Sequence, residues 1–170
     1  MGKNVSRKIR SETELQKASD HLYYEIGMFQ SLVNGMASGI AGESVINNAL
    51  LESFGIHTRA LLWFFYAENS RDDDVIADDF FSTPTEWQSI RPPLTEILDR
   101  AKKRADKEIA HLTYKRIDIS PEQKKWQFLP ISSDMNKVID KFLIIVTLDF
   151  LGERWNDFKE QRHLKDENGG

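Results

Sequence analysis

Residues 11–36 read SETELQKASDHLYYEIGMFQSLVNGM, and the apolar positions in this stretch recur in steps of three or four. These positions are Leu15, Ala18, Leu22, Ile26, Phe29, Val33 and Met36. The spacing places them on one face of a helix, so it predicts a long amphipathic α-helix. Ser11, with Glu14 three residues later, forms a capping-box pattern that marks the start of this helix. We therefore expect a fold built from helices that pack along apolar faces.

Three further segments show helical periodicity. Residues 43–66 are apolar around most of the helix circumference, so this helix is expected to lie at the centre of the fold or to be shared with a second copy. The two prolines at 92–93 fit the first turn of a third helix that runs to about Leu112. A last helix is expected to open near residues 132–133 and to continue toward the C-terminus.

These four segments predict an all-α fold, an up-and-down bundle of four principal helices with one or two short extra helices. The chain has 170 residues, which suits one domain with a single core. We expect this domain over residues 11–164, a flexible basic tail over 1–10 and a disordered polar tail over 165–170.

The composition excludes several classes of site and partner. There is no cysteine, which excludes disulfides, thiolate metal sites and a catalytic thiol, and makes the cytoplasm the expected compartment. No stretch approaches the length of apolar sequence that a membrane helix needs, so no membrane association is expected. The net charge of −4 argues against global binding of nucleic acid and leaves room for a local basic face.

Charge is segregated along the chain. Residues 91–116 carry a net charge of +4, so the remainder carries −8, and residues 68–86 alone carry −6. A ligand that bears phosphate would be steered toward the basic segment. The acidic residues at 72–79 are expected to lie in a solvated connector rather than in a magnesium site.

Two residues of the basic segment are the candidate catalytic pair. Arg104 and His111 are seven positions apart, so on a continuous helix they would lie about 20° from eclipsed and about 10.5 Å apart along the axis. Histidine can move the proton of a 2′-hydroxyl, and arginine can stabilise charge on the phosphoryl centre, so the pair could cleave RNA without a metal or cofactor. Lys107, Glu108 and Tyr114 are the supporting or substrate-binding candidates, with Tyr114 able to stack on a base.

The runs RADKEIAHLTYKR at 104–116 and LESFGIHTRALLWFFY at 51–66 resemble small all-helical bacterial proteins related to the HEPN superfamily. The resemblance covers roughly residues 45–116 and implies a helical bundle, a homodimer and a metal-independent endoribonuclease of toxin or defence type with an antitoxin or other protein partner. Arg104 and His111 match its Arg-x4-6-His motif. Active members usually place Asn, Asp or His directly after the arginine, whereas Ala105 follows here.

His57 is the remaining candidate on the second helix. It shares a stripe with Leu50, Phe54 and Leu61, which favours a buried histidine satisfied by a hydrogen bond, with support of the His111 region as the functional alternative. His57 and Arg59 point about 160° apart on a helix, so they cannot form one site from the same helix.

Other functions stay open at this stage. The chain could be a helical interaction or nucleotide-binding module without catalysis. It could instead hold a metal, because Glu108 and His111, like Glu160 and His163, have the i, i+3 spacing of di-iron bundles. Against the metal interpretation, His163 lies close to the fraying end of the last helix, away from any bundle interior.

Overall fold

The computed structural model describes residues 7–39, 45–83, 85–106, 114, 117, 120 and 125–160. Across these ranges the secondary structure is helical and contains no strand, which confirms the all-α prediction. The long helices are α1 (Glu12–Ala37), α2 (Val45–Tyr66) and α6 (Phe128–Ile145). The short ones are η1 (Ala77–Phe80), α3 (Glu86–Ile90), α4 (Glu96–Arg104), α7 (Leu148–Leu151) and η4 (Glu153–Trp155).

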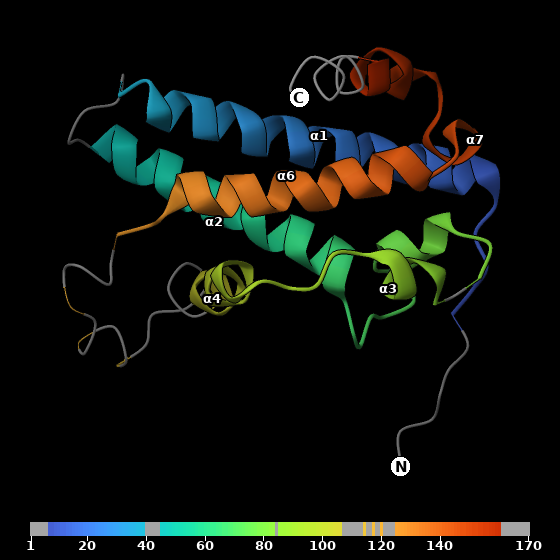
Figure 1. Ribbon diagram of the computed structural model, residues 1–170, viewed down its shortest axis with the longest axis horizontal. Helices are drawn as coiled ribbons and strands as arrows, with labels where there is room; N and C mark the ends of the chain where they lie inside the picture. Colours follow the sequence, from blue (N-terminus) through green and yellow to red (C-terminus); the bar gives the residue numbers. More distant parts are fainter. Residues whose placement is uncertain are drawn as a thin grey trace.

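The three long helices lie alongside one another (Figure 1). α2 runs antiparallel to α1, and α6 runs in the same direction as α2. In the same view α4 is seen nearly end-on, so it crosses the long helices, and it contacts both α2 and α6. The third of the four principal helices predicted from the sequence is therefore, over its described part, a short helix set across three long ones.

The start of α1 is as predicted. Ser11 is the N-cap, its hydroxyl accepts a hydrogen bond from the backbone N–H of Glu14, and the Glu14 side chain accepts one from the backbone N–H of Ser11. This reciprocal capping satisfies two backbone donors that a helix start otherwise leaves unpaired. The predicted apolar face is buried at Leu15, Leu22, Ile26, Phe29 and Val33.

The bounds of the later helices differ from those predicted. α4 begins at Glu96 rather than at the two prolines, because the Thr95 hydroxyl caps it by accepting from the backbone N–H of Leu98 at 3.3 Å. α6 begins at Phe128, before Pro130 rather than after it, since proline is tolerated in the first turn of a helix. α6 then stops at Ile145, and further on the chain turns at Gly152, whose φ of 79° favours glycine.

The core is a cluster of aromatic rings where α2, η1, α3 and α6 meet. Phe142 of α6 lies within 6 Å, ring centre to ring centre, of Phe64, Phe65, Phe80 and Trp87. These four rings come from three segments of the chain, so Phe142 links them into one core. The buried indole N–H of Trp87 donates to the backbone carbonyl of Phe65 at 2.9 Å, which satisfies its polar atom.

The acidic connector is more ordered than expected. It contains η1, and Asp78 within it is buried. The Asp78 carboxylate accepts from the amide of Gln88 on α3 at 3.2 Å, and η1 also contacts α2. The prediction of a fully solvated connector is therefore wrong at Asp78, because Ala77 and Phe80 on either side of it are buried in the core.

Candidate functional site

The basic end of α4 contains the one member of the predicted pair that the structure describes. The last turn of α4 carries Lys102, Lys103 and Arg104, and cations are stabilised at this end of a helix by its dipole. After Arg104 the helix widens into a π turn over residues 105–106. Such turns insert an extra residue into the helix and are frequent at functional sites.

Arg104 is held against Trp126, just before α6. The guanidinium carbon lies 4.5 Å from the centre of the indole ring, and Nη1 donates to the backbone carbonyl of Lys125 at 3.0 Å. The Trp126 ring also packs against Phe54 of α2, with ring centres 6.1 Å apart and ring planes nearly perpendicular. Trp126 therefore stands between the core and Arg104 and fixes the guanidinium in one place.

A second contact ties the π turn to α2. Nε of Arg59 lies 2.5 Å from Oδ1 of Asp106, and both side chains remain about half exposed. Asp106, which follows Arg104, and Trp126, which packs on Arg104, therefore both contact α2. The end of α4 is thus positioned by α2 as well as by its own backbone.

Of the other predicted site residues, the structure describes Tyr114 and His57. Lys107, Glu108 and His111 lie outside the described residues, so the helical spacing between Arg104 and His111 stays a prediction. Tyr114 is described and is 91 % exposed, an accessible ring and hydroxyl.

His57 lies in a contact between α1 and α2. Its Nδ1 is 2.7 Å from Oε2 of Glu25, and the edge of its ring packs against Tyr24 at 5.8 Å between ring centres. The imidazole is buried and hydrogen-bonded, as its apolar stripe indicated. This pair fixes the ring through one nitrogen and joins the two longest helices.

Sequence reasoning missed two partners of the candidate residues. Trp126 is not among the residues predicted for the site, and the signal that could have marked it is an aromatic residue directly after Lys124 and Lys125. Glu25 carried no signal of its own, because the partner that a buried histidine finds on a neighbouring helix depends on how the two helices are rotated.

The N-terminal segment packs on the acidic connector. The Arg7 guanidinium binds both carboxylate oxygens of Asp79, at 3.2 and 2.8 Å, and also donates to the backbone carbonyls of Arg71 and Asp74. Arg10 donates to the carbonyl of Asp72. Residues 7 and 10, within the segment predicted as a tail, therefore make several contacts with the domain.

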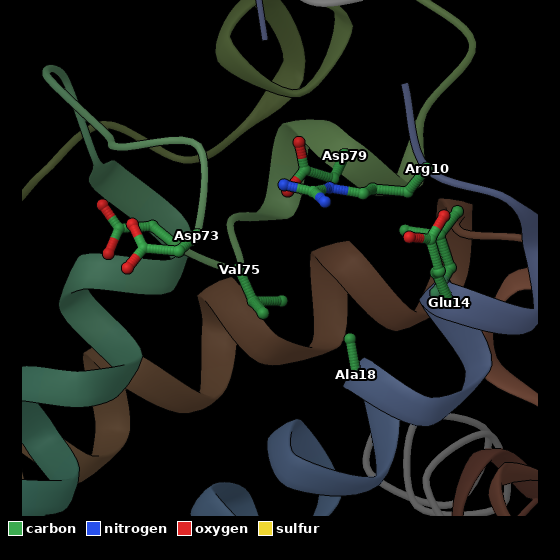
Figure 2. Close-up of a pocket in the computed structure, with 8 residues that line it drawn as sticks. Arg10, Glu14, Ala18, Asp73, Val75 and Asp79 are labelled. Atoms are coloured by element: carbon green, nitrogen blue, oxygen red, sulfur yellow. The ribbon is translucent and has the colours of Figure 1, made fainter. Parts of the chain in front are cut away.

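A pocket of about 170 Å³ opens beside this segment. In Figure 2, Val75 and Ala18 lie between Asp73 on one side and Glu14 on the other, and Arg10 extends beside Asp79. The pocket is far in sequence from the basic end of α4, and it contains none of the predicted site residues. Two of its carboxylates are engaged by neighbours, since Glu14 binds Lys8 at 2.8 Å and Asp79 binds Arg7.

The described ranges contain no group of three His, Asp or Glu side chains placed to hold a metal ion. None of the helices in those ranges is both long and apolar enough to cross a membrane. No protein-family model, curated protein or solved structure that we compared with the chain matches it.

Proposed function

We propose that this chain is a HEPN-like helical protein that binds the phosphate groups of RNA at the end of α4 and cleaves RNA without a metal. Arg104 and His111 are the proposed reacting pair. The observation that carries the proposal is the guanidinium of Arg104 fixed 4.5 Å above the ring of Trp126.

A fixed guanidinium suits phosphate binding. Its planar fork of N–H donors matches phosphate oxygens, and a side chain already held in place loses less conformational freedom when it binds. Lys102 and Lys103 in the same turn add positive charge. Because residues 91–116 carry +4 while the rest of the chain carries −8, a polyanion is drawn to this end of the molecule.

An aromatic ring beside the basic turn suits single-stranded RNA in particular. Unpaired bases stack on aromatic side chains and on arginine planes, whereas bases in a duplex cannot. Trp126 is half-buried beside Arg104, and Tyr114 is exposed ten residues beyond it in the sequence. A basic surface with aromatic rings is the combination that binds single strands with little sequence preference.

The proposed reaction is an internal transesterification. The imidazole of His111 takes the proton from a 2′-hydroxyl, the 2′-oxygen attacks the adjacent phosphorus, and the bond from phosphorus to the 5′-oxygen breaks. Water protonates the leaving 5′-oxygen, the His111 imidazolium returns its proton to water, and a 2′,3′-cyclic phosphate remains. Arg104 stabilises the charge on the phosphoryl oxygens, Lys107 adds a phosphate contact and Glu108 orients the pair.

Cleavage of labelled single-stranded RNA in excess chelator tests this proposal. The purified protein should yield fragments that end in a cyclic phosphate, and His111→Ala should abolish cleavage while the helical dichroism is unchanged. Arg104→Lys should lose most of the activity, because lysine keeps the charge without the planar fork. Arg100→Lys is the matched control, since Arg100 lies on the same helix and pairs with Glu96 at 3.0 Å.

Two outcomes would contradict the proposal. One is absence of cleavage on RNAs of varied sequence and structure. The other is stoichiometric iron or zinc that is lost in His111→Ala, which would replace the ribonuclease with a metal site at Glu108 and His111. Activity that is unchanged in Glu108→Ala would leave Glu108 without the orienting role.

A further inference from the structure

An apolar stripe runs along the solvent side of α2. We call it the α2 stripe, and its members fall within about 40° of Ile56 around the helix axis. They are Val45, Ala49, Ile56, Ala60 and Trp63. Val45 is 83 % exposed, Ile56 55 % and Trp63 39 %, so the large members stand well out of the core.

The opposite face of α2 already fills the core. Phe54, Leu61 and Phe65 are fully buried, and Phe64 is 6 % exposed. The sequence predicted that this helix is central or is shared with a second copy, and Phe64 and Phe65 fit the first alternative, because they pack within one chain. The α2 stripe is therefore a second, narrower apolar face on the solvent side of the helix. A helix that packs only within its own chain is expected to be polar on that side.

Two residues of opposite charge lie along one edge of the stripe. Glu52 and Arg59 are both exposed and lie seven residues apart, one on each side of Ile56 along the helix. They lie on the same edge of the stripe, about 40° and 60° from Ile56. Arg59 reaches Asp106 within its own chain, and its side chain is still 57 % exposed.

We propose that α2 packs antiparallel against α2 of a second copy of this chain, about a two-fold axis at Ile56. In this register Ile56 meets its own counterpart, and Ala49 lies opposite Trp63 of the second copy. Glu52 then lies beside Arg59 of the second copy, and the same pair forms again across the axis. Each stripe thus sets a small residue against a large one and a negative charge against a positive one.

The occupant is a second copy because the stripe complements itself. A two-fold interface uses the same surface on both partners, so its residues must match under reversal of the helix direction. The positions 49 and 63 are equally far from Ile56, and the charges at 52 and 59 are nearly so. An unrelated partner would not require this symmetry between large and small or between acid and base.

This interface does not depend on the proposed RNA chemistry. Arg104 and Trp126 are not part of the stripe, so loss of pairing and loss of RNA cleavage can be measured separately. Variants of the stripe should therefore change the oligomeric state whether or not the chain is a ribonuclease.

Sedimentation of the full chain over a range of micromolar concentrations is the first test. We expect a reversible dimer, and Ile56→Glu should convert it to monomer. Ile144→Glu is the matched control, because Ile144 is also an isoleucine on a long helix and is 56 % exposed against 55 % for Ile56. A wild-type chain that is monomeric at every concentration, or equal effects of the two variants, would overturn the proposal.

Single cysteines test the register, because the chain contains none of its own. Under mild oxidation Ile56→Cys should form a disulfide dimer rapidly, and a mixture of Ala49→Cys with Trp63→Cys should form the mixed dimer. Ala49→Cys alone should not, since its two copies would lie about 21 Å apart along the helix axis. Rapid crosslinking of Ala49→Cys with itself would show a parallel pair and would overturn the antiparallel register.

Charge exchange separates a dimer contact from a merely exposed pair. Glu52→Arg places two arginines side by side across the proposed interface and should weaken the dimer. The double variant Glu52→Arg with Arg59→Glu should restore it, because the opposite signs meet again. Because Arg59→Glu also removes the partner of Asp106, the double variant is compared with Arg59→Glu alone. A dimer that is no stronger in the double variant than in Arg59→Glu would contradict the proposed pairing.

Discussion

Nδ1 of His57 lies 2.7 Å from Oε2 of Glu25, and this hydrogen bond joins α2 to α1. The histidine is buried and the glutamate is partly exposed, with 9 % and 29 % of their side chains accessible. A polar ring buried in a helix interface is costly unless its nitrogen is paired, so Glu25 makes His57 compatible with the core. The same contact fixes the rotation of α2 and thereby which of its faces remains outside.

Removal of Glu25 should destabilise the fold. Glu25→Ala leaves Nδ1 of the buried His57 without this partner, and we expect a loss of about 1–3 kcal/mol in the free energy of unfolding. Glu25→Gln keeps a hydrogen-bonding group of the same length and should lose less. Urea denaturation followed by dichroism measures both, and equal stability of the wild type and Glu25→Ala would refute a structural role for the pair.

The helices could be predicted from the sequence to the extent that local chemistry defines them. Ser11 and Glu14 mark the start of α1 because both halves of the capping box are adjacent in the chain. The start of α4 was predicted too early. The prolines are typical of a first helical turn, but the N-cap is Thr95, two residues after them. The turn at Asp78 was missed because its burial depends on Phe80 reaching a core built by distant helices.

Asp78 should make the stability depend on pH. Burial raises the pKa of its carboxyl, and its Oδ1 is buried without a hydrogen-bond partner in the described part of the chain. The folded state therefore holds the proton more tightly than the unfolded state, so stability should fall as pH rises from the ordinary aspartate range through the raised pKa.

Asp78→Asn tests this sign. The amide removes the buried charge and can still accept from Gln88, so the melting temperature at neutral pH should rise above that of the wild type. The difference should shrink as the pH is lowered below the ordinary pKa of aspartate. Asp79→Asn is the control, because it weakens the contacts with Arg7 and should lower the melting temperature at neutral pH. A gain for Asp78→Asn that is the same at both pH values would contradict the assignment.

The Ser19 hydroxyl should contribute more to the stability of the fold than an exposed serine does. Its buried hydroxyl donates to the carbonyl of Leu151 at 2.6 Å and accepts from the indole N–H of Trp155 at 3.1 Å. Ser19→Ala leaves both groups unpaired, so we expect a loss of about 1–3 kcal/mol in unfolding free energy. Ser31→Ala, an exposed serine on the same helix, should change little, and comparable losses in the two variants would contradict this role.

The candidate site could be predicted only in part. Arg104 followed from the charge of its segment and its spacing from His111, both of which are properties of the sequence. Trp126 could not be paired with Arg104, because the two are brought together by the packing of α4 against α6 and of Trp126 against Phe54. The α2 stripe could not be predicted, because the sequence of α2 is apolar around most of the helix. Only the packing of Phe64 and Phe65 in the core shows which face is buried and which is exposed.

Binding of a fluorescent single-stranded 2′-O-methyl RNA, which the proposed reaction cannot cleave, followed by anisotropy in excess chelator at several salt concentrations, tests the central claim most directly. We predict that the wild type binds with an affinity that falls steeply with salt, and that Arg104→Lys weakens binding by about tenfold, which corresponds to about 1.4 kcal/mol. Arg100→Lys, which keeps the same charge on the same helix, should bind like the wild type. Equal affinities for Arg104→Lys and Arg100→Lys would contradict the claim that the guanidinium held over Trp126 is the phosphate-binding group.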